Sequence, residues 1–217
     1  MSYSRIGEVW TEYVEARCGT AVEAMAKKEM DARFFPSREG AVKAVLAIVP
    51  PDAEVGCGGS WTMRQIGLLD ALRERGNTVL VHEPGMEFEE AMRIRRRALQ
   101  APYYLSSSNA VTMEGELVNV DGIGNRVSGI SFGPGTVIIM AGYNKLVADL
   151  EGAMQRIREV AAPANAVRYN LDTPCAKKGR CTDCSGPSRI CRITTIVGWR
   201  PMTTDLKVFL VGEQLGF

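Results

Sequence analysis

The chain has 217 residues, of which 46% are hydrophobic and 24% are charged, a composition typical of a soluble globular protein. It contains 26 Lys and Arg against 25 Asp and Glu, so its net charge gives no general field to attract DNA, RNA or an acidic membrane. The longest apolar run is interrupted by Lys43 and ends in two prolines, and none resembles a secretory signal. We therefore expect a cytoplasmic protein of one domain, residues 1–217, with no nucleic-acid or membrane partner.

The N-terminal part of the chain, residues 1–36, is predicted to be a helical segment. Apolar residues recur there at the spacing of one helix face: Ile6, Val9, Trp10 and Tyr13. Pro36 interrupts this pattern. Ser37 is the predicted N-cap of a second amphipathic helix, which the prolines at 50–51 end.

Strands and helices alternate along the rest of the chain. Strands are predicted at 54–57, 78–81, 103–105, 116–120, 136–140, 192–198 and 206–211. Helices are predicted at 61–72, 86–99 and 144–161, the last stopped by Pro163. The strand TVIIM at 136–140 is apolar on both faces, as a central parallel strand would be. The alternation predicts a layered α/β fold with a mostly parallel sheet.

A glycine-rich stretch, GCGGSWT at 56–62, lies where a predicted strand turns into a helix. Glycine lets the backbone come close to a ligand, and the amides at a helix start carry partial positive charge. Gly58, Gly59, Ser60 and Thr62 are therefore candidates for binding a phosphate or carboxylate. The alternative is a tight turn in which Ser60 is the N-cap.

Two further polar loops follow predicted strands. Open α/β sheets bind ligands at the carboxyl ends of their strands, so Asn109 in the stretch 106–112 is a candidate ligand residue. In the second loop, Arg126 can hold an anion through two hydrogen bonds, and Asp121 can act as a base. Asn125 lies beside them as a further ligand-binding candidate. The alternatives are a hydrophilic loop and a turn that caps its own backbone.

Lys145 directly follows the TVIIM strand, where its ammonium could meet an anionic ligand. A Lys in the first turn of a helix is electrostatically unfavourable, and this favours a functional role. Asn144 is either a ligand residue or a helix N-cap. His82, the single histidine, could be a general base, but a structural role is favoured. The basic run at 93–97 is interpreted as the solvated face of a helix.

Four of the six cysteines lie within a short segment rich in Gly, Pro, Lys and Arg, at residues 170–192. They are Cys175, Cys181, Cys184 and Cys191, with the spacing C-x5-C-x2-C-x6-C. Thiols stay reduced in the cytoplasm, so this group indicates an iron–sulfur cluster or, alternatively, a zinc ion. Nearby basic side chains would offset the charge of the thiolates. Disulfides or idle thiols are the remaining alternative.

Four motifs, taken in this order, resemble the LUD domain, the lactate-utilization family. They are GxGGSxT at 56–62, NAVTxxG at 109–115, DGxGNRV at 121–127 and GxNK at 142–145. The resemblance extends from about residue 37 to the end of the chain. It implies a Rossmann-like sheet with helices on both faces, like that of sugar-phosphate isomerases and CoA transferases, with the cysteine segment as an insertion. It also implies that the loop 56–62 binds phosphate and that the polar residues named above line one cleft.

The resemblance links this chain to the oxidation of lactate to pyruvate beside iron–sulfur partner subunits. The expected function is therefore an iron–sulfur component of lactate or hydroxy-acid utilization that binds a small anionic metabolite, with Lys145, Asp121 and Arg126 as catalytic residues. One alternative is a non-redox enzyme or binding protein for a phosphorylated or carboxylated metabolite, with structural zinc. Another is an assembly subunit with a zinc knuckle. The substrate, the electron partner and association into a homo-oligomer are left open.

Overall fold

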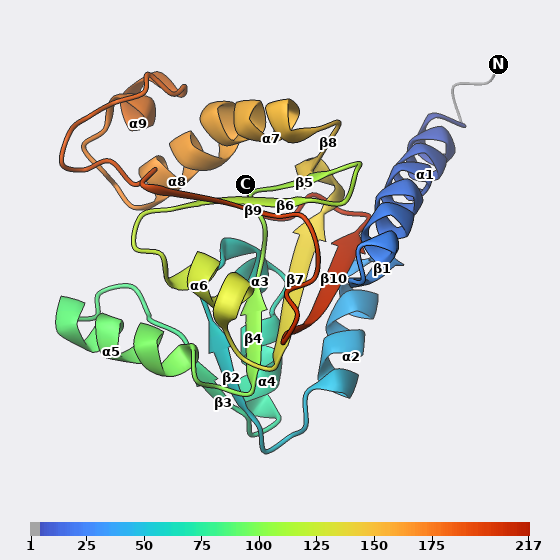
Figure 1. Ribbon diagram of the computed structural model, residues 1–217, viewed down its shortest axis with the longest axis horizontal. Coiled ribbons are helices and arrows are strands. Elements are labelled where there is room, and N and C mark those ends of the chain that lie inside the picture. The colour runs from blue at the N-terminus through green and yellow to red at the C-terminus, as the bar shows by residue number, and fades with distance from the viewer. Residues whose placement is uncertain (1–4) are drawn as a thin grey trace.

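The computed structural model describes residues 5–217 as two sheets with helices packed around them (Figure 1). The helices are α1 (Ile6–Lys27), α2 (Arg38–Ile48), α3 (Trp61–Gln65), α4 (Leu68–Glu74), α5 (Phe88–Ala98), α6 (Asn125–Phe132), α7 (Leu150–Arg156), α8 (Ala162–Arg168) and α9 (Pro174–Lys178), with a 3-10 turn η2 (Tyr143–Lys145) and a π-helical turn η3 (Ile157–Ala161). The strands are β1 (Asp31–Phe35), β2 (Glu54–Cys57), β3 (Thr78–Leu80), β4 (Tyr103–Ser106), β5 (Ala110–Thr112), β6 (Leu117–Asp121), β7 (Thr136–Gly142), β8 (Leu146–Val147), β9 (Ile193–Val197) and β10 (Asp205–Val211).

The larger sheet has six strands in the order β1-β10-β7-β4-β2-β3, and every neighbouring pair is parallel. Its central strand β7 is buried on both faces, as predicted. Ile138 and Met140 pack toward α2, α3 and α4, whereas Val137 and Ile139 belong to the core on the opposite face. The predicted α/β fold, with a mostly parallel sheet covered on both faces, is confirmed.

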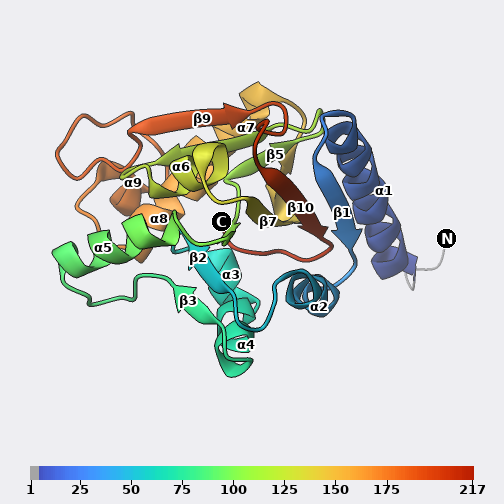
Figure 2. The same cartoon turned by 60° about the horizontal axis from the view of Figure 1, so that its bottom comes forward.

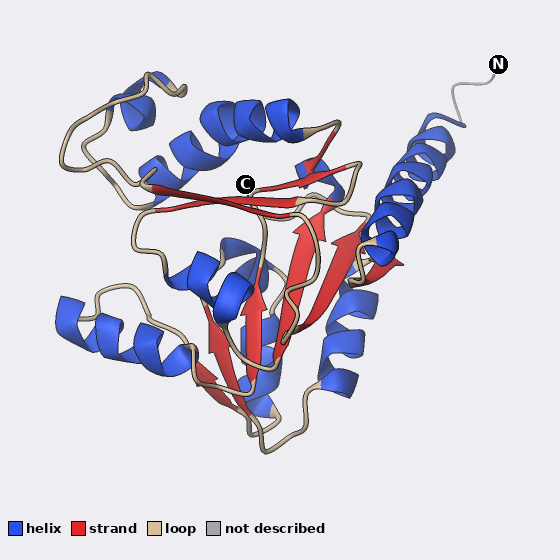
Figure 3. Ribbon diagram, in the orientation of Figure 1, coloured by secondary structure: helices blue, strands red, loops and turns tan. Residues whose placement is uncertain are grey.

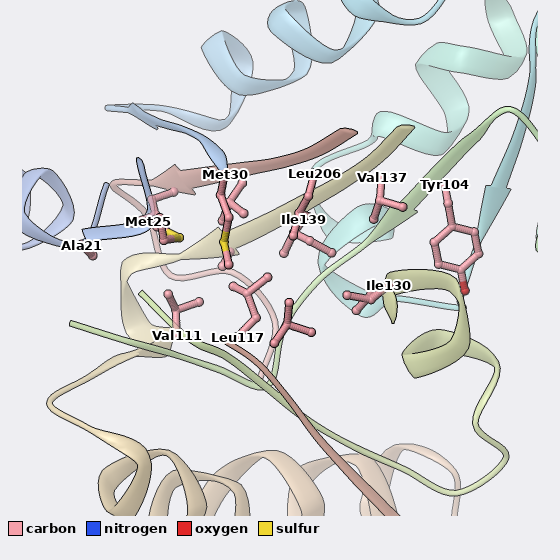
Figure 4. Close-up of a cluster of buried hydrophobic side chains, with 14 of the residues drawn as sticks. Ala21, Met25, Met30, Tyr104, Val111, Leu117, Ile130, Val137, Ile139 and Leu206 are labelled. Atoms are coloured by element: carbon pink, nitrogen blue, oxygen red, sulfur yellow. The ribbon is translucent and has the colours of Figure 1, made fainter. Parts of the chain in front are cut away.

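A second sheet, which the sequence did not predict, lies against the first. It has four strands in the order β8-β5-β6-β9, with antiparallel β5–β6 and β6–β9 pairs (Figure 3). Figure 2 shows this sheet on one side of the six-stranded sheet and α2, α3 and α4 on the other. Val111 and Leu117 point from the second sheet toward Ile139 and Leu206 of the first, in a core that is closed to solvent (Figure 4).

The prediction that residues 1–36 are helical is wrong at its C-terminal end. The described helix ends at Lys27, and Glu29 takes the left-handed conformation with φ 63°. Residues Asp31–Phe35 then form the edge strand β1, paired in parallel with β10. Ser37 is confirmed as the N-cap of α2, because its side chain accepts a hydrogen bond from the Gly40 N–H.

Two other predicted helices are divided by their backbone conformation. Gly67, with φ 69°, separates α3 from α4, since a left-handed residue cannot continue a right-handed helix. The helix predicted at 144–161 begins instead at Leu150, where the Asp149 side chain caps it. It is not stopped by Pro163, which lies in the first turn of α8 directly after the π-helical turn. Proline is tolerated there because a first-turn N–H has no partner within its helix.

No helix in residues 5–217 is both long and apolar enough to cross a membrane.

Candidate functional site

A cavity of about 420 Å³ opens at the carboxyl ends of three neighbouring parallel strands. Gly58 follows β2, Ser107 follows β4, and Lys145 lies three residues beyond the end of β7. This edge is where open parallel sheets place their ligands, because the loops that leave adjacent strands converge there. The three loops that the sequence places after these strands therefore meet at one cavity in the structure.

Lys145 lies at the inner end of the cavity and is 3% exposed. Its Nζ donates hydrogen bonds to Ser107 Oγ at 2.8 Å and to Thr62 Oγ1 at 3.1 Å. Burial lowers the pKa of this amine well below its ordinary value, and the positive charges of Arg156 and Arg126 lower it further. An amine in this setting favours its neutral form.

Asp121 and Arg126, the other two candidates for catalysis, form an ion pair with each other. Arg126 Nε donates to Asp121 Oδ1 at 2.7 Å, and Asp121 Oδ2 accepts from the Val127 N–H at 3.1 Å. The same guanidinium donates to Asn109 Oδ1 at 3.0 Å and to the Val120 carbonyl at 2.7 Å. These contacts connect the loop before β5 to the end of β6 and to α6. Asn109, Asp121 and Arg126 therefore stabilise one wall of the cavity.

The glycines of the stretch 56–62 are explained by their protein neighbours. A Cβ on Gly58 would lie 2.8 Å from the hydroxyl oxygen of Tyr104, and a Cβ on Gly59 would lie 2.4 Å from Cε1 of the His82 ring. Gly59 also has φ +75°, a conformation that favours glycine. The Ser60 side chain makes no capping hydrogen bond, and the helix that follows has only five residues. The tight turn accounts for Gly58 and Gly59, the capping hydrogen bond expected of Ser60 is not formed, and anion binding by this stretch stays a prediction.

Two cationic side chains that the sequence interpretation did not assign to the site also line the cavity. Arg95 of α5 and Arg168 of α8 both face it, together with His82. The Nε atom of Arg168 is buried without a hydrogen-bond partner, and so is Nδ1 of His82. Burial and the neighbouring arginines lower the pKa of His82 to about 4, so its imidazole is neutral near pH 7. Among the described lining residues, the one acidic side chain is that of Asp121, which is already paired.

The cysteine segment forms one wall of the same cavity through Ile190 and Cys191. The N–H of Arg192 donates to the Asp121 carbonyl at 2.9 Å, and a Cβ on Gly122 would lie 3.1 Å from the Ile190 carbonyl oxygen. The end of the segment is therefore packed directly against β6. Its first part is a short helix, α9, with Thr173 as N-cap and Cys175 buried.

All six cysteines carry free thiols, and the other three thiols of the segment act on that of Cys191. Burial and the neighbouring Cys181 raise the pKa of the Cys191 thiol, Arg189 lowers it, and Cys175 and Cys184 raise it further. Within residues 5–217, no group of three or more Cys, His, Asp or Glu side chains has an arrangement that could hold a metal ion. Metal binding by this segment stays a prediction.

Most of the predicted site residues share the cavity. Those that line it are Gly58, Gly59, Ser60, Thr62, Asn109, Asp121, Asn125, Arg126, Lys145 and Cys191. Asn144 is not among its lining residues. Both polar atoms of the Asn144 side chain bind the end of the chain, since Oδ1 accepts from the Leu215 N–H and Nδ2 donates to the Gly216 carbonyl. The interpretation of Arg95 as part of a solvated face is also wrong, because its side chain is half-buried at the cavity.

Sequence signals for the missed residues are weak. Arg168 lies in a helix that is predicted to end before it. Phe217 lines the cavity and stacks on Trp61, with ring centroids 6.3 Å apart, which no local pattern indicates. Ser107 belongs to the polar stretch 106–112, in which the sequence interpretation names Asn109 as the ligand candidate. A serine directly after a buried strand is the one signal that could have identified it.

An open parallel sheet with a cation-lined cavity at its carboxyl edge defines an α/β protein suited to a small anionic ligand. Residues 18–211 match the family model of the LUD domain, and the chain therefore belongs to the LUD family. The fold is similar to that of a DUF162 family protein from Deinococcus radiodurans, with a TM-score of 0.50 and 14% identity. That comparison covers 93% of this chain and 98% of the other. No curated protein matches the sequence.

Proposed function

We propose that this LUD-family protein binds a small carboxylate or phosphate metabolite in the cavity and is a component of lactate or related hydroxy-acid oxidation. The observation that carries the proposal is the excess of cationic side chains over acidic side chains among the described lining residues. Arg95 and Arg168 have no carboxylate partner there, whereas Asp121 is paired with Arg126. A partly buried guanidinium binds carboxylate and phosphate groups strongly because its N–H groups match their oxygens.

The cysteine segment is proposed to hold an iron–sulfur cluster, with zinc as the alternative. This proposal rests on the chemistry of the donor set, four free thiols near the guanidinium of Arg189, and not on their placement, which forms no metal-holding group among the described residues. When bound, a cluster would accept or donate single electrons next to the cavity, since Cys191 belongs to its wall. A zinc ion would instead pin the segment against β6 without redox chemistry.

Anion binding is tested by thermal unfolding in the presence of lactate, pyruvate or inorganic phosphate. A ligand that binds the folded state raises the melting temperature by mass action. We expect at least one of these anions to stabilise the protein, and we expect Arg168→Met to lose most of that effect. The matched control is Arg93→Met, because Arg93 is an exposed arginine of α5 outside the lining. Equal stabilisation of both variants, or none of the wild type, would contradict the assignment.

The metal is tested by anaerobic purification, visible absorption and metal analysis. We expect a coloured protein with iron and sulfide, and loss of both in Cys184→Ser. Cys18→Ala is the control, because Cys18 is a buried residue of α1 and is distant in sequence from the cysteine segment. A colourless protein with stoichiometric zinc would leave the anion site in place but exclude the electron-transfer role.

A further inference from the structure

The Lys145 nitrogen has two described hydrogen-bond partners, so one of its four tetrahedral positions, apart from its bond to carbon, is without a partner. Its two contacts in the described structure are the hydroxyl oxygens of Thr62 and Ser107. A neutral amine has two N–H groups and one lone pair, so these two oxygens use both N–H groups. An ammonium would have a third N–H without a protein acceptor among these contacts, in a position removed from solvent.

We propose that Lys145 is a nucleophile that forms a Schiff base with the carbonyl group of a 2-oxo acid held in the cavity. This inference rests on the proposed anion site and names its substrate class. The lone pair of Nζ attacks the carbonyl carbon, and one proton of the attacking nitrogen passes to the carbonyl oxygen to give a carbinolamine that keeps one N–H. Loss of that oxygen as water, with the N–H proton, leaves the C=N bond, so the step needs no oxidant or reductant.

The cavity has the positive charge that such a substrate requires. Arg126 and Arg168 both line it, and Arg126 acts electrostatically on both Lys145 and Arg168. The Nε atom of Arg168 is buried without a hydrogen-bond partner, so the protein leaves a donor of this guanidinium unused. A 2-oxo acid carries its carboxylate next to its carbonyl, and it can therefore place one group toward the arginines while the other meets the amine.

The chemical state of the amine agrees with this role. Burial and two nearby positive charges lower its pKa, so a larger fraction of Lys145 is neutral near pH 7 than of an exposed lysine. The segment at Gly216 packs over the same nitrogen, since a Cβ there would lie 3.2 Å from Nζ. This packing restricts water at the amine from one side.

The test is reductive trapping with pyruvate and with 2-oxoglutarate, which differ in length, in the presence of cyanoborohydride. Cyanoborohydride supplies the hydride that converts the imine into a stable secondary amine. Peptide mass mapping of the wild-type protein then locates the adduct without any variant. We expect labelling of Lys145 at least tenfold faster than labelling of Lys43, an exposed lysine of α2, and no adduct at this position in Lys145→Met. We also expect the rate at Lys145 to fall less with decreasing pH than the rate at Lys43.

The outcomes separate this inference from the proposed function. If either acid raises the melting temperature but does not label Lys145 faster than Lys43, the Schiff-base inference is overturned while the anion site stands. If neither acid binds or labels Lys145, the substrate class is overturned, and the lactate and phosphate titrations alone decide the proposed function. A rate at Lys145 that parallels the rate at Lys43 at every pH would also overturn the inference.

Discussion

Arg126 and Asp121 form an ion pair that joins the start of α6 to the end of β6, with Arg126 Nε 2.7 Å from the Asp121 carboxylate. Their side chains are 18% and 8% exposed, so the pair is largely removed from solvent. The two residues, predicted as separate catalytic groups, therefore satisfy each other. Of the three residues predicted to be catalytic, Lys145 is the one whose side chain contacts only neutral hydroxyl groups among its described hydrogen-bond partners.

Replacing Arg126 is expected to destabilise the fold. Arg126→Ala leaves the Asp121 carboxylate buried without its partner, which costs about 3 kcal/mol for a largely buried pair. The control is Arg97→Ala, because Arg97 pairs with Glu54 at the surface, with side chains 61% and 39% exposed. That pair contributes less than about 1 kcal/mol. Urea denaturation gives both values, and equal losses would contradict a structural role for Arg126.

Replacing Gly216 is expected to disturb the inner end of the cavity. A Cβ at this position would lie 2.4 Å from Thr62 Oγ1, and the residue has φ +61°. Gly67→Ala is the matched control, because Gly67 has φ +69° but nothing within 4 Å of an added Cβ. We expect Gly67→Ala to cost about 1 kcal/mol from the backbone alone. Gly216→Ala should cost about 1–3 kcal/mol more through crowding, and it should weaken anion binding. Identical melting temperatures for the two variants would refute the close approach.

The pH dependence of stability should report the buried amine of Lys145. Its folded-state pKa lies below the ordinary value of 10.5, so in the window between the two the unfolded chain holds a proton that the folded chain lacks. Unfolding then takes up a proton, and stability rises with pH through this window, by up to about 1.4 kcal/mol per pH unit. Urea denaturation of wild type and Lys145→Met from neutral pH to about pH 10 gives the difference. If the difference in unfolding free energy between wild type and Lys145→Met does not change with pH, the pKa of Lys145 is not lowered by folding.

Removing the metal should weaken the anion site, because Cys191 and Ile190 belong to its wall. If the segment holds a metal, chelation should lower the melting temperature and reduce the affinity for the stabilising anion by about tenfold, since the ligand must then order the wall when it binds. Isothermal titration before and after chelation measures this change. Cys184→Ser should reproduce the effect of the chelator, and Cys18→Ala should not. An unchanged affinity for the anion after complete metal loss would show that metal binding by the cysteine segment does not influence the anion site.

The sequence by itself was sufficient to predict the parallel sheet. The strand TVIIM is apolar on both faces, and a strand of this kind is stable only between two covering layers. Polar and glycine residues follow β2, β4 and β7, and the carboxyl ends of parallel strands meet at one edge, so the convergence of Thr62, Asn109 and Lys145 could be predicted. The Ser37 cap is local chemistry, readable without any tertiary contact.

Only the tertiary structure decided which of these side chains remain available for a ligand. Asp121 and Arg126 pair with each other, and Asn144 holds the Gly216 segment, because the partner of a polar group depends on chain segments distant in sequence. The second sheet joins β8, β5, β6 and β9 across long intervals of sequence, and such short pieces have little periodicity of their own. Arg168 reaches the cavity from a helix whose path depends on a π-helical turn. Local sequence patterns indicate secondary-structure propensity and which face of a helix or strand is buried. The partner of a polar side chain and the pKa of an ionisable group depend instead on the neighbours that folding brings together.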